Sequence, residues 1–171
     1  MSGAVFIIMG VASTGKSTVG LQFSQAIDAK FIDGDDLHPR SNVLKMADGH
    51  ALNDDDRAPW LERISDAAFS IEKKNEIGVI VCSALKKNYR DTIRSGNDKV
   101  VFLHLHAEKD LIVKRMKNRA GHFMPVSLLD SQYATLEMPT SDEPLTHMVD
   151  VSCELEQVVK SCVAVSQRYL G

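Results

Sequence analysis

A glycine-rich motif near the amino terminus carries the clearest chemical signal in this sequence. Residues 10–17 read GVASTGKS and match G-x-x-x-x-G-K-[S/T] at every fixed position. In such a loop, backbone N–H groups surround the phosphates of a nucleoside triphosphate, a lysine reaches the β- and γ-phosphates, and a hydroxyl binds Mg²⁺. We therefore predict that Lys16 is catalytic and that Ser17 is a magnesium ligand; the alternative is a glycine turn that only caps a helix. The predicted ATP-binding residues are Gly10, Val11, Ala12, Ser13, Thr14, Gly15, Lys16, Ser17 and Thr18.

The rest of the sequence narrows the class of nucleotide-dependent protein. It contains neither N-K-x-D, which reads guanine, nor D-x-x-G, the switch motif of GTPases. At 171 residues the chain is also too short for a motor. A small P-loop kinase is the leading hypothesis, and a nucleotide-dependent regulator without a small acceptor is the alternative from another class.

Acidic residues follow the second predicted strand, where residues 33–36 read DGDD. The carboxyl ends of parallel strands meet at one edge of a sheet, so these acids would face the phosphate loop. Phosphoryl transfer to an alcohol needs a carboxylate that orients the hydroxyl and accepts its proton. We assign this role to Asp35 and a magnesium-binding role, direct or through water, to Asp33. The alternative is an Asp-Gly turn whose acids are solvated.

Basic residues further along the chain could hold the acceptor. Arg57 follows three aspartates that would also suit a helix start, and a guanidinium beside a pocket can bind a carboxylate through two hydrogen bonds. Lys86 and Arg90 could converge with Ser83 after the third predicted strand, although a solvated basic helix face would look the same. Seven aspartates lie between residues 33 and 57, against three basic residues. This balance favours a polyhydroxylated acceptor with one carboxylate over an acceptor that carries phosphate.

A pair of arginines predicts a lid over the nucleotide. Arg115 and Arg119 are four residues apart and would share one helix face. Residues 121–125, GHFMP, then interrupt the helical pattern. Arginines on a mobile segment could close over the triphosphate, neutralise charge in the transition state and exclude water. We predict a lid over about residues 115–139 with both arginines catalytic and His122 as a hinge or substrate contact; a plain surface pair is the alternative.

Apolar runs alternate with helical patterns along the chain. Strands are expected at 5–9, 30–32, 78–82, 100–105 and about 147–151. Helices are expected over 16–28, much of 39–73, 86–95, 111–119, 126–137 and 154–169. Pro59 is placed in the first turn of the helix after the aspartates. The alternation predicts one α/β domain over residues 1–171, a three-layer P-loop kinase fold in which helices flank a central parallel sheet.

The composition excludes several classes of protein. Hydrophobic residues make up 44% of the chain and charged residues 25%, as in globular proteins. The formal net charge of -3 creates no broad field for nucleic acid or an anionic membrane. No apolar run approaches the roughly 20 residues that cross a bilayer, and the apolar amino terminus is interpreted as a buried strand, not a signal peptide. Three cysteines without C-x-x-C spacing suggest free thiols in a reducing cytosol.

Beyond the phosphate loop, the chain resembles the gluconokinase family as far as about residue 144. The motifs that carry this resemblance are DGDDLHP at 33–39, N-x-x-KM-x-x-G at 42–49, L-x-D-x-DR-x-PWL at 52–61, CSALKK-x-YRD at 82–91, R-x-x-x-R-x-x-HFMP at 115–125 and SQ-x-x-x-LE-x-P at 131–139. One departure lies at variable positions of the loop, where the family often has Ser-Gly-Ser and this chain has Ala12-Ser13-Thr14.

The resemblance implies a specific reaction, the phosphorylation of D-gluconate at its 6-hydroxyl by ATP with Mg²⁺. It also implies a nucleoside-monophosphate-kinase-like fold with a lid, and a homodimer in the cytoplasm without a nucleic-acid or membrane partner. A kinase of the same fold for another small acceptor, such as shikimate or a nucleotide, is the competing hypothesis. The full set of expected substrate-binding residues is Asp35, Arg57, Lys86, Arg90, His122 and Gln132.

Overall fold

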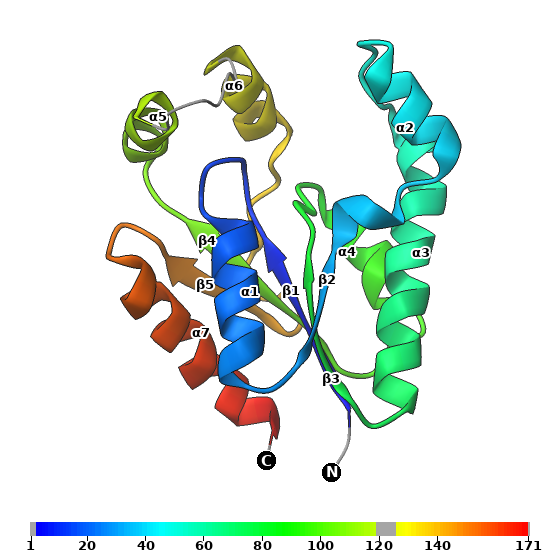
Figure 1. The fold of residues 1–171 in the computed structure, drawn as a ribbon, viewed down its shortest axis with the longest axis vertical. Coiled ribbons are helices and arrows are strands. Elements are labelled where there is room, and N and C mark those ends of the chain that lie inside the picture. Colours follow the sequence, from blue (N-terminus) through cyan, green and yellow to red (C-terminus); the bar gives the residue numbers. More distant parts are fainter. Residues whose placement is uncertain (1–2, 119–125, 171) are drawn as a thin grey trace.

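A five-stranded parallel sheet forms the centre of the protein (Figure 1). The structure, a computed structural model, describes residues 3–118 and 126–170. The strand order is β2-β3-β1-β4-β5. The strands are β1 (Ala4–Met9), β2 (Lys30–Asp33), β3 (Ile77–Val81), β4 (Val100–His106) and β5 (Thr146–Asp150). Each sits within a few residues of its predicted place.

Helices cover both faces of the sheet, which confirms the predicted three-layer α/β fold (Figure 1). α1 and α7 pack on one face, and α3 and α4 pack together on the other. The helices are α1 (Lys16–Ala26), α2 (Arg40–Ala47), α3 (Asp54–Lys73), α4 (Lys87–Arg94), α5 (Lys109–Lys117), α6 (Val126–Thr135) and α7 (Leu155–Leu170), with a short 3₁₀ helix η1 (Gly34–Leu37) after β2.

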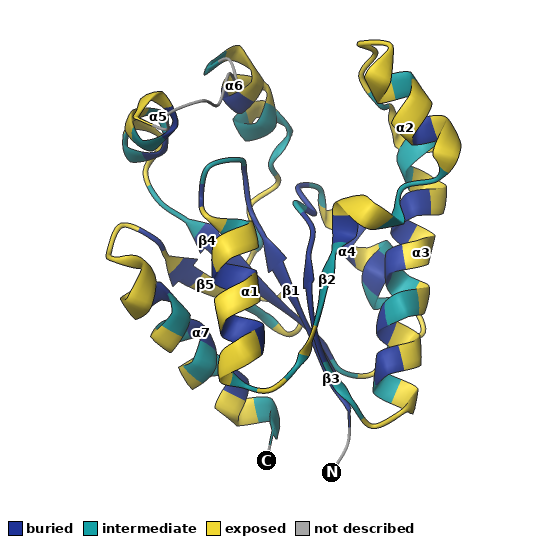
Figure 2. Ribbon diagram, viewed as in Figure 1, coloured by how far each residue is buried: buried dark blue, intermediate teal, exposed yellow. Residues whose placement is uncertain are grey.

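The core lies on the two faces of β1, whose residues are all buried (Figure 2). Phe6 and Ile8 pack in the cluster beneath α1 and α7. Val5, Ile7 and Met9 point to the opposite face and pack beneath α3 and α4. Because successive strand residues face opposite sides, a strand covered on both faces must be apolar throughout. This burial holds the loop after β1 in a fixed position.

The start of α3 differs from its prediction. The helix begins at Asp54, and Asn53 and Asp56 cap it reciprocally through side chain and backbone. Pro59 therefore lies inside the helix and not in its first turn, so the prediction for Pro59 was wrong. The capping box satisfies N–H groups at the helix start that would otherwise lack partners, which moves that start towards the amino terminus.

Two groups of helices rise above the carboxyl edge of the sheet, α5 and α6 on one side and α2 on the other (Figure 1). The predicted lid, at about residues 115–139, includes the end of α5 and the whole of α6, and the predicted break at 121–125 lies outside the described residues. None of the helices within 3–118 and 126–170 has the length and apolar character needed to cross a membrane.

Candidate functional site

The loop between β1 and α1 has the backbone that its glycines allow. Gly10 has φ 142°, and a Cβ at this position would lie 2.6 Å from the backbone oxygen of Leu105. Gly15 has φ 87° and forms the N-cap of α1. Both conformations favour glycine. The loop therefore ends at a helix amino terminus, whose free N–H groups and positive dipole end attract anions.

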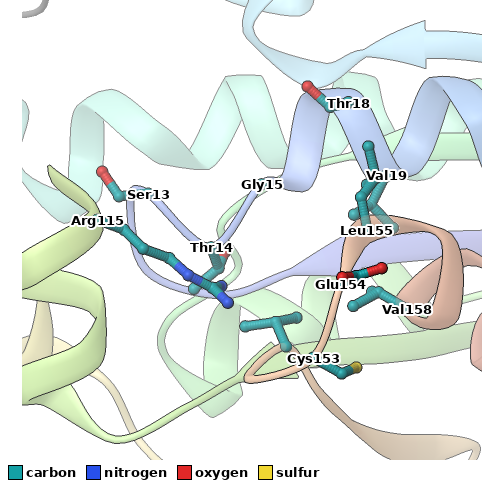
Figure 3. A pocket seen from close by; sticks show the side chains of 11 residues that line it. Ser13, Thr14, Gly15, Thr18, Val19, Arg115, Cys153, Glu154, Leu155 and Val158 are labelled. Atoms are coloured by element: carbon teal, nitrogen blue, oxygen red, sulfur yellow. The ribbon is translucent and has the colours of Figure 1, made fainter. Parts of the chain in front are cut away.

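A cavity of about 430 Å³ lies on one side of this loop (Figure 3). Its walls include Val19, Leu155 and Val158, together with Ser13 and Thr14 of the loop. Arg115 extends from α5 along the same cavity (Figure 3). An apolar slot with a few polar groups at one end is typical of a site for a planar ligand such as a nucleotide base.

A second cavity, of about 280 Å³, lies on the other side of the loop. It brings together residues from the ends of three neighbouring strands, as expected for ligand sites in parallel sheets. Several predicted site residues meet here, namely Ala12, Ser13, Gly15, Lys16, Ser17, Thr18, Asp33, Asp35 and Gln132, with Ser83 beside them. The smaller cavity is the more polar of the two, and both Lys16, the predicted catalytic lysine, and Asp35, the predicted base, line it.

Polar groups of the phosphate loop form hydrogen bonds with one another and with a side chain of α6. Lys16 Nζ and Thr14 Oγ1 each donate to the backbone oxygen of Val11, at 2.9 Å in both cases. The N–H of Ala12, in the same peptide unit, donates to Gln132 Oε1 at 2.6 Å. A nucleotide must replace these partners.

Burial sets the protonation of the two catalytic candidates. Burial lowers the pKa of Lys16 to about 8, although the nearby charge of Asp35 acts to raise it. For Asp35, burial and the carboxylate of Asp33 raise the pKa above its ordinary value, against the attraction of His38 and Lys16. A carboxylate with a raised pKa is a stronger proton acceptor, which suits a general base.

The turn after β2 is built to hold Asp35 at the cavity. Asp33 Oδ1 accepts from the N–H of Asp35 at 3.0 Å, which starts η1. Trp60 Nε1 donates to the oxygen of Gly34 at 2.7 Å and fixes the turn to α3. Trp60 is buried in the core, and it also anchors this turn.

A cluster of charged and aromatic side chains lies on α3 and α4. Tyr89 donates to Asp54 Oδ1 at 2.5 Å and accepts from Arg57 Nη1 at 3.3 Å. Lys86 Nζ binds the same aspartate at 3.2 Å. The side chain of Arg57 stays 33% exposed, so this arginine keeps donors for a ligand. Arg57 and Lys86 thus share Asp54 and Tyr89 as neighbours.

His38 is a candidate that the sequence analysis did not single out. Its ring stacks on Trp60 with 4.2 Å between centroids, and Asn42 Nδ2 lies 3.2 Å from its Nδ1. Burial lowers the pKa of His38, Asp35 opposes this shift and Arg57 adds to it. His38 is therefore electrostatically coupled to both Asp35 and Arg57. The signal was present in DGDDLHP, but one histidine in a loop does not reveal its stacking partner.

Arg90 requires a correction. Its side chain is fully buried, and its guanidinium donates to Glu143 and to the backbone oxygens of Ala84, Leu85 and Glu137. Burial raises the pKa of Glu143, but hydrogen bonds from Arg90 and Arg94 outweigh it and hold that pKa below its ordinary value. The structure therefore gives Arg90 a structural contact in place of the predicted substrate contact.

We predict that Arg90→Ala lowers the free energy of unfolding by about 3–5 kcal/mol, because Glu143 keeps a buried charge without its main partner. Chemical denaturation measures this change. Lys87→Ala is the matched control, since it removes an exposed ion pair with Asp91 on the same helix and should have little effect. Unchanged stability with weaker acceptor binding would return Arg90 to the substrate site.

Arg119 and His122 lie outside the described residues, so the structure does not place these two predicted site residues. Gln132, the other lid residue expected at the substrate site, contacts the phosphate loop directly.

Comparisons with known proteins agree with this architecture. The family model described as Shikimate kinase matches residues 12–166. The thermosensitive gluconokinase of Escherichia coli K12 is 50% identical over 162 residues, which cover 95% of this chain and 87% of that protein. The thermoresistant gluconokinase of the same organism is 45% identical over 96% of this chain and 94% of its own length.

Solved structures give the same result. A gluconokinase from Sinorhizobium meliloti 1021 superposes with a TM-score of 0.85 and 42% identity, covering 96% of this chain and 92% of that one. Shikimate kinase from Aquifex aeolicus superposes with a TM-score of 0.57 at 15% identity, which shows a shared fold alone.

Proposed function

Because this chain belongs to the gluconokinase family of P-loop kinases, we propose that it transfers the γ-phosphoryl group of ATP to the 6-hydroxyl of D-gluconate, giving 6-phospho-D-gluconate and ADP. One observation in the structure carries the proposal: Lys16 and Asp35 line the same cavity at the carboxyl edge of the sheet. Lys16 can supply positive charge to the phosphoryl group, and Asp35 beside it can act as the base for a hydroxyl.

The two cavities support one direction for the bound nucleotide. The adenine base occupies the larger, apolar cavity beside Arg115, and the phosphates run across residues 13–18. The γ-phosphoryl group, farthest from the base, then lies in the smaller cavity. Ser13, Gly15 and Thr18 line both cavities, which makes the phosphate loop the bridge between them.

Transfer follows from this placement. Asp35 orients the 6-hydroxyl and accepts its proton while the oxygen attacks the γ-phosphorus. The bond from that phosphorus to the β–γ bridging oxygen breaks, and ADP leaves with the electron pair. Lys16 and the loop N–H groups stabilise the negative charge on the transferring group, and Arg115 adds a further positive charge from α5.

Ser17 and Asp33 supply the protein ligands for the Mg²⁺ that accompanies ATP. Both line the smaller cavity, and their hydroxyl and carboxylate oxygens are the hard ligands that this ion prefers. Across residues 3–118 and 126–170 no cluster of three or more His, Cys, Asp or Glu side chains could hold a metal, so the phosphates complete the ligand set. The ion neutralises phosphate charge when it is bound.

The carboxylate end of gluconate is held by Arg57 and Lys86. The charges of Asp35 and Arg57 both act on His38, and Arg57 and Lys86 share Asp54 as a partner; this supports an acceptor site that extends from the base to the cationic cluster. Aspartates and Asn42 beside this path offer partners for sugar hydroxyls. As in the family it resembles, the enzyme works as a homodimer in the cytoplasm; unpaired Cys82, Cys153 and Cys162 suit a reducing compartment.

Release of ADP with a panel of acceptors tests the proposal. With ATP and Mg²⁺, gluconate should give rapid ADP release, while shikimate and nucleoside monophosphates should give only the slow background rate. A faster rate with one of these other acceptors would assign a different kinase activity. Slow ATP hydrolysis that no acceptor accelerates would favour the regulator hypothesis.

We predict that Arg57→Ala raises the KM for gluconate about 10- to 100-fold, because a charge-assisted hydrogen bond to the carboxylate is lost. The KM for ATP should change little. Arg63→Ala is the matched control, since this exposed arginine lies on the same helix outside the cluster and makes only a long contact with the oxygen of Leu37. Steady-state kinetics with each substrate varied will measure the effect, and an equal rise in both KM values would contradict the assignment.

A further inference from the structure

The peptide unit between Val11 and Ala12 has both of its polar groups in hydrogen bonds within the protein. Its oxygen accepts from Lys16 Nζ and Thr14 Oγ1, and its N–H donates to Gln132 Oε1. The first two partners come from the loop itself. The third comes from α6, 120 residues further along the chain. One donor of the phosphate site is therefore covered by a side chain from the predicted lid.

The position of Gln132 is fixed by the packing around it. Leu129, one turn earlier on α6, is fully buried, and Lys109 of α5 forms an ion pair with Asp130 at 2.6 Å. Just after the helix, the N–H of Glu137 donates to the oxygen of Leu85 at 2.8 Å. The backbone of α6 is thus anchored on both sides of Gln132, and a change of partner requires only rotation of its side chain.

Ala12 lines the cavity to which the proposed reaction assigns the terminal phosphate. Ala12 lines the smaller cavity with Asp35 and is not part of the wall of the larger cavity, where the base fits. A nucleotide that enters from the larger cavity therefore reaches Ala12 last, with its γ-phosphoryl group. ADP is one phosphoryl group shorter and ends before this point.

A carboxamide is suited to exchange partners here. Its oxygen accepts a hydrogen bond, and its NH₂ group donates two. A phosphoryl oxygen carries charge and is a stronger acceptor than the neutral Oε1, so it competes successfully for the Ala12 N–H. Rotation of the freed side chain would turn the Nε2 donor towards the same phosphoryl group.

Resting on the proposed nucleotide site and reaction, we propose that Gln132 is a positioning residue that distinguishes ATP from ADP. It covers the Ala12 N–H when no γ-phosphate is present, yields that N–H to the γ-phosphoryl group, and then donates to the group through Nε2. After transfer, when the γ-phosphoryl group has left the nucleotide, Gln132 covers the Ala12 N–H again.

The test compares Gln132→Glu and Gln132→Ala with wild type and with Ser131→Ala, an exposed control on the same helix. Calorimetry without gluconate measures the Kd of ADP and of the β,γ-imido analogue of ATP. A glutamate side chain can accept from the Ala12 N–H, but it repels phosphate and has no donor. Gln132→Glu should therefore weaken binding of the analogue about ten-fold or more and binding of ADP less than three-fold. Gln132→Ala should lower kcat about ten-fold and leave the Kd of ADP unchanged.

The amide signal of Ala12 gives a readout that a merely structural role would not move. In wild-type protein labelled with ¹⁵N, the analogue should shift this signal strongly and ADP only weakly, and in Gln132→Ala the signal of the free protein should already be displaced. The proposal would be overturned if Gln132→Glu weakened the binding of ADP and of the analogue equally. An Ala12 signal that the analogue does not shift in wild-type protein would also overturn it. The binding measurements contain no acceptor, so they remain informative if gluconate proves not to be the substrate.

Discussion

Lys16→Ala should abolish turnover and leave the fold intact. The ammonium group supplies charge to the transferring phosphoryl group in a partly enclosed site, where charge counts for more than in water. We expect kcat to fall about a thousand-fold or more. Lys16 Nζ donates to the oxygen of Val11 in the same loop, and burial lowers the pKa of Lys16 to about 8. Burial of the charged Lys16 side chain carries a desolvation cost, and substitution by alanine removes that cost. The folded state should therefore survive the substitution.

Kinetics and thermal unfolding together measure this prediction. Lys114→Ala is the control, because Lys114 is an exposed lysine on α5 and its loss should affect neither activity nor stability. Turnover by Lys16→Ala within ten-fold of wild type would remove this lysine from the mechanism. Loss of turnover together with loss of the folded state would show a structural role instead.

Asp35→Asn should lower kcat about 10²- to 10⁴-fold while ATP binding changes little, because asparagine can orient a hydroxyl but cannot accept its proton. The pH profile adds a second signature. Asp35 acts in its ionised form, so activity falls as the pH drops through its pKa, and the raised pKa of Asp35 places this fall above the pH at which an ordinary aspartate is protonated. The variant should lose this acid limb.

Asp36→Asn provides the matched control, since Asp36 is the next residue of η1 and lies outside the lining of the smaller cavity. It should retain wild-type kcat and keep the acid limb, displaced slightly towards lower pH because the charge of Asp36 adds to the raised pKa of Asp35. Wild-type turnover by Asp35→Asn, or the same loss in both variants, would contradict the assignment of Asp35 as the base.

Local patterns in the sequence were sufficient to predict most of the fold. The apolar runs predicted β1, β3 and β4, because a strand buried on both faces needs apolar residues throughout. The edge strands β2 and β5 are mostly exposed or half-buried and were predicted from shorter apolar runs. The phosphate loop was predictable because its glycines and lysine have fixed spacing. The error at Pro59 was avoidable, since Asn53 and Asp56 already have the spacing of a capping box.

The site was less predictable where it depends on contacts between distant segments. Arg90 on a helix after a strand looks the same whether it binds a substrate or a buried carboxylate, and Glu143 is 53 residues away. Likewise, no local pattern joins Gln132 to Ala12. Tertiary packing decides the partners of such long polar side chains.

The central claim is that this cavity directs the γ-phosphoryl group of ATP to a primary alcohol of a sugar acid. Phosphorus NMR of a reaction with ATP, Mg²⁺ and D-gluconate tests it most directly. We predict one new phosphomonoester signal, coupled to the two protons at C6 and equal in amount to the ADP formed. Inorganic phosphate as the product, or a phosphoester at another carbon, would contradict the account.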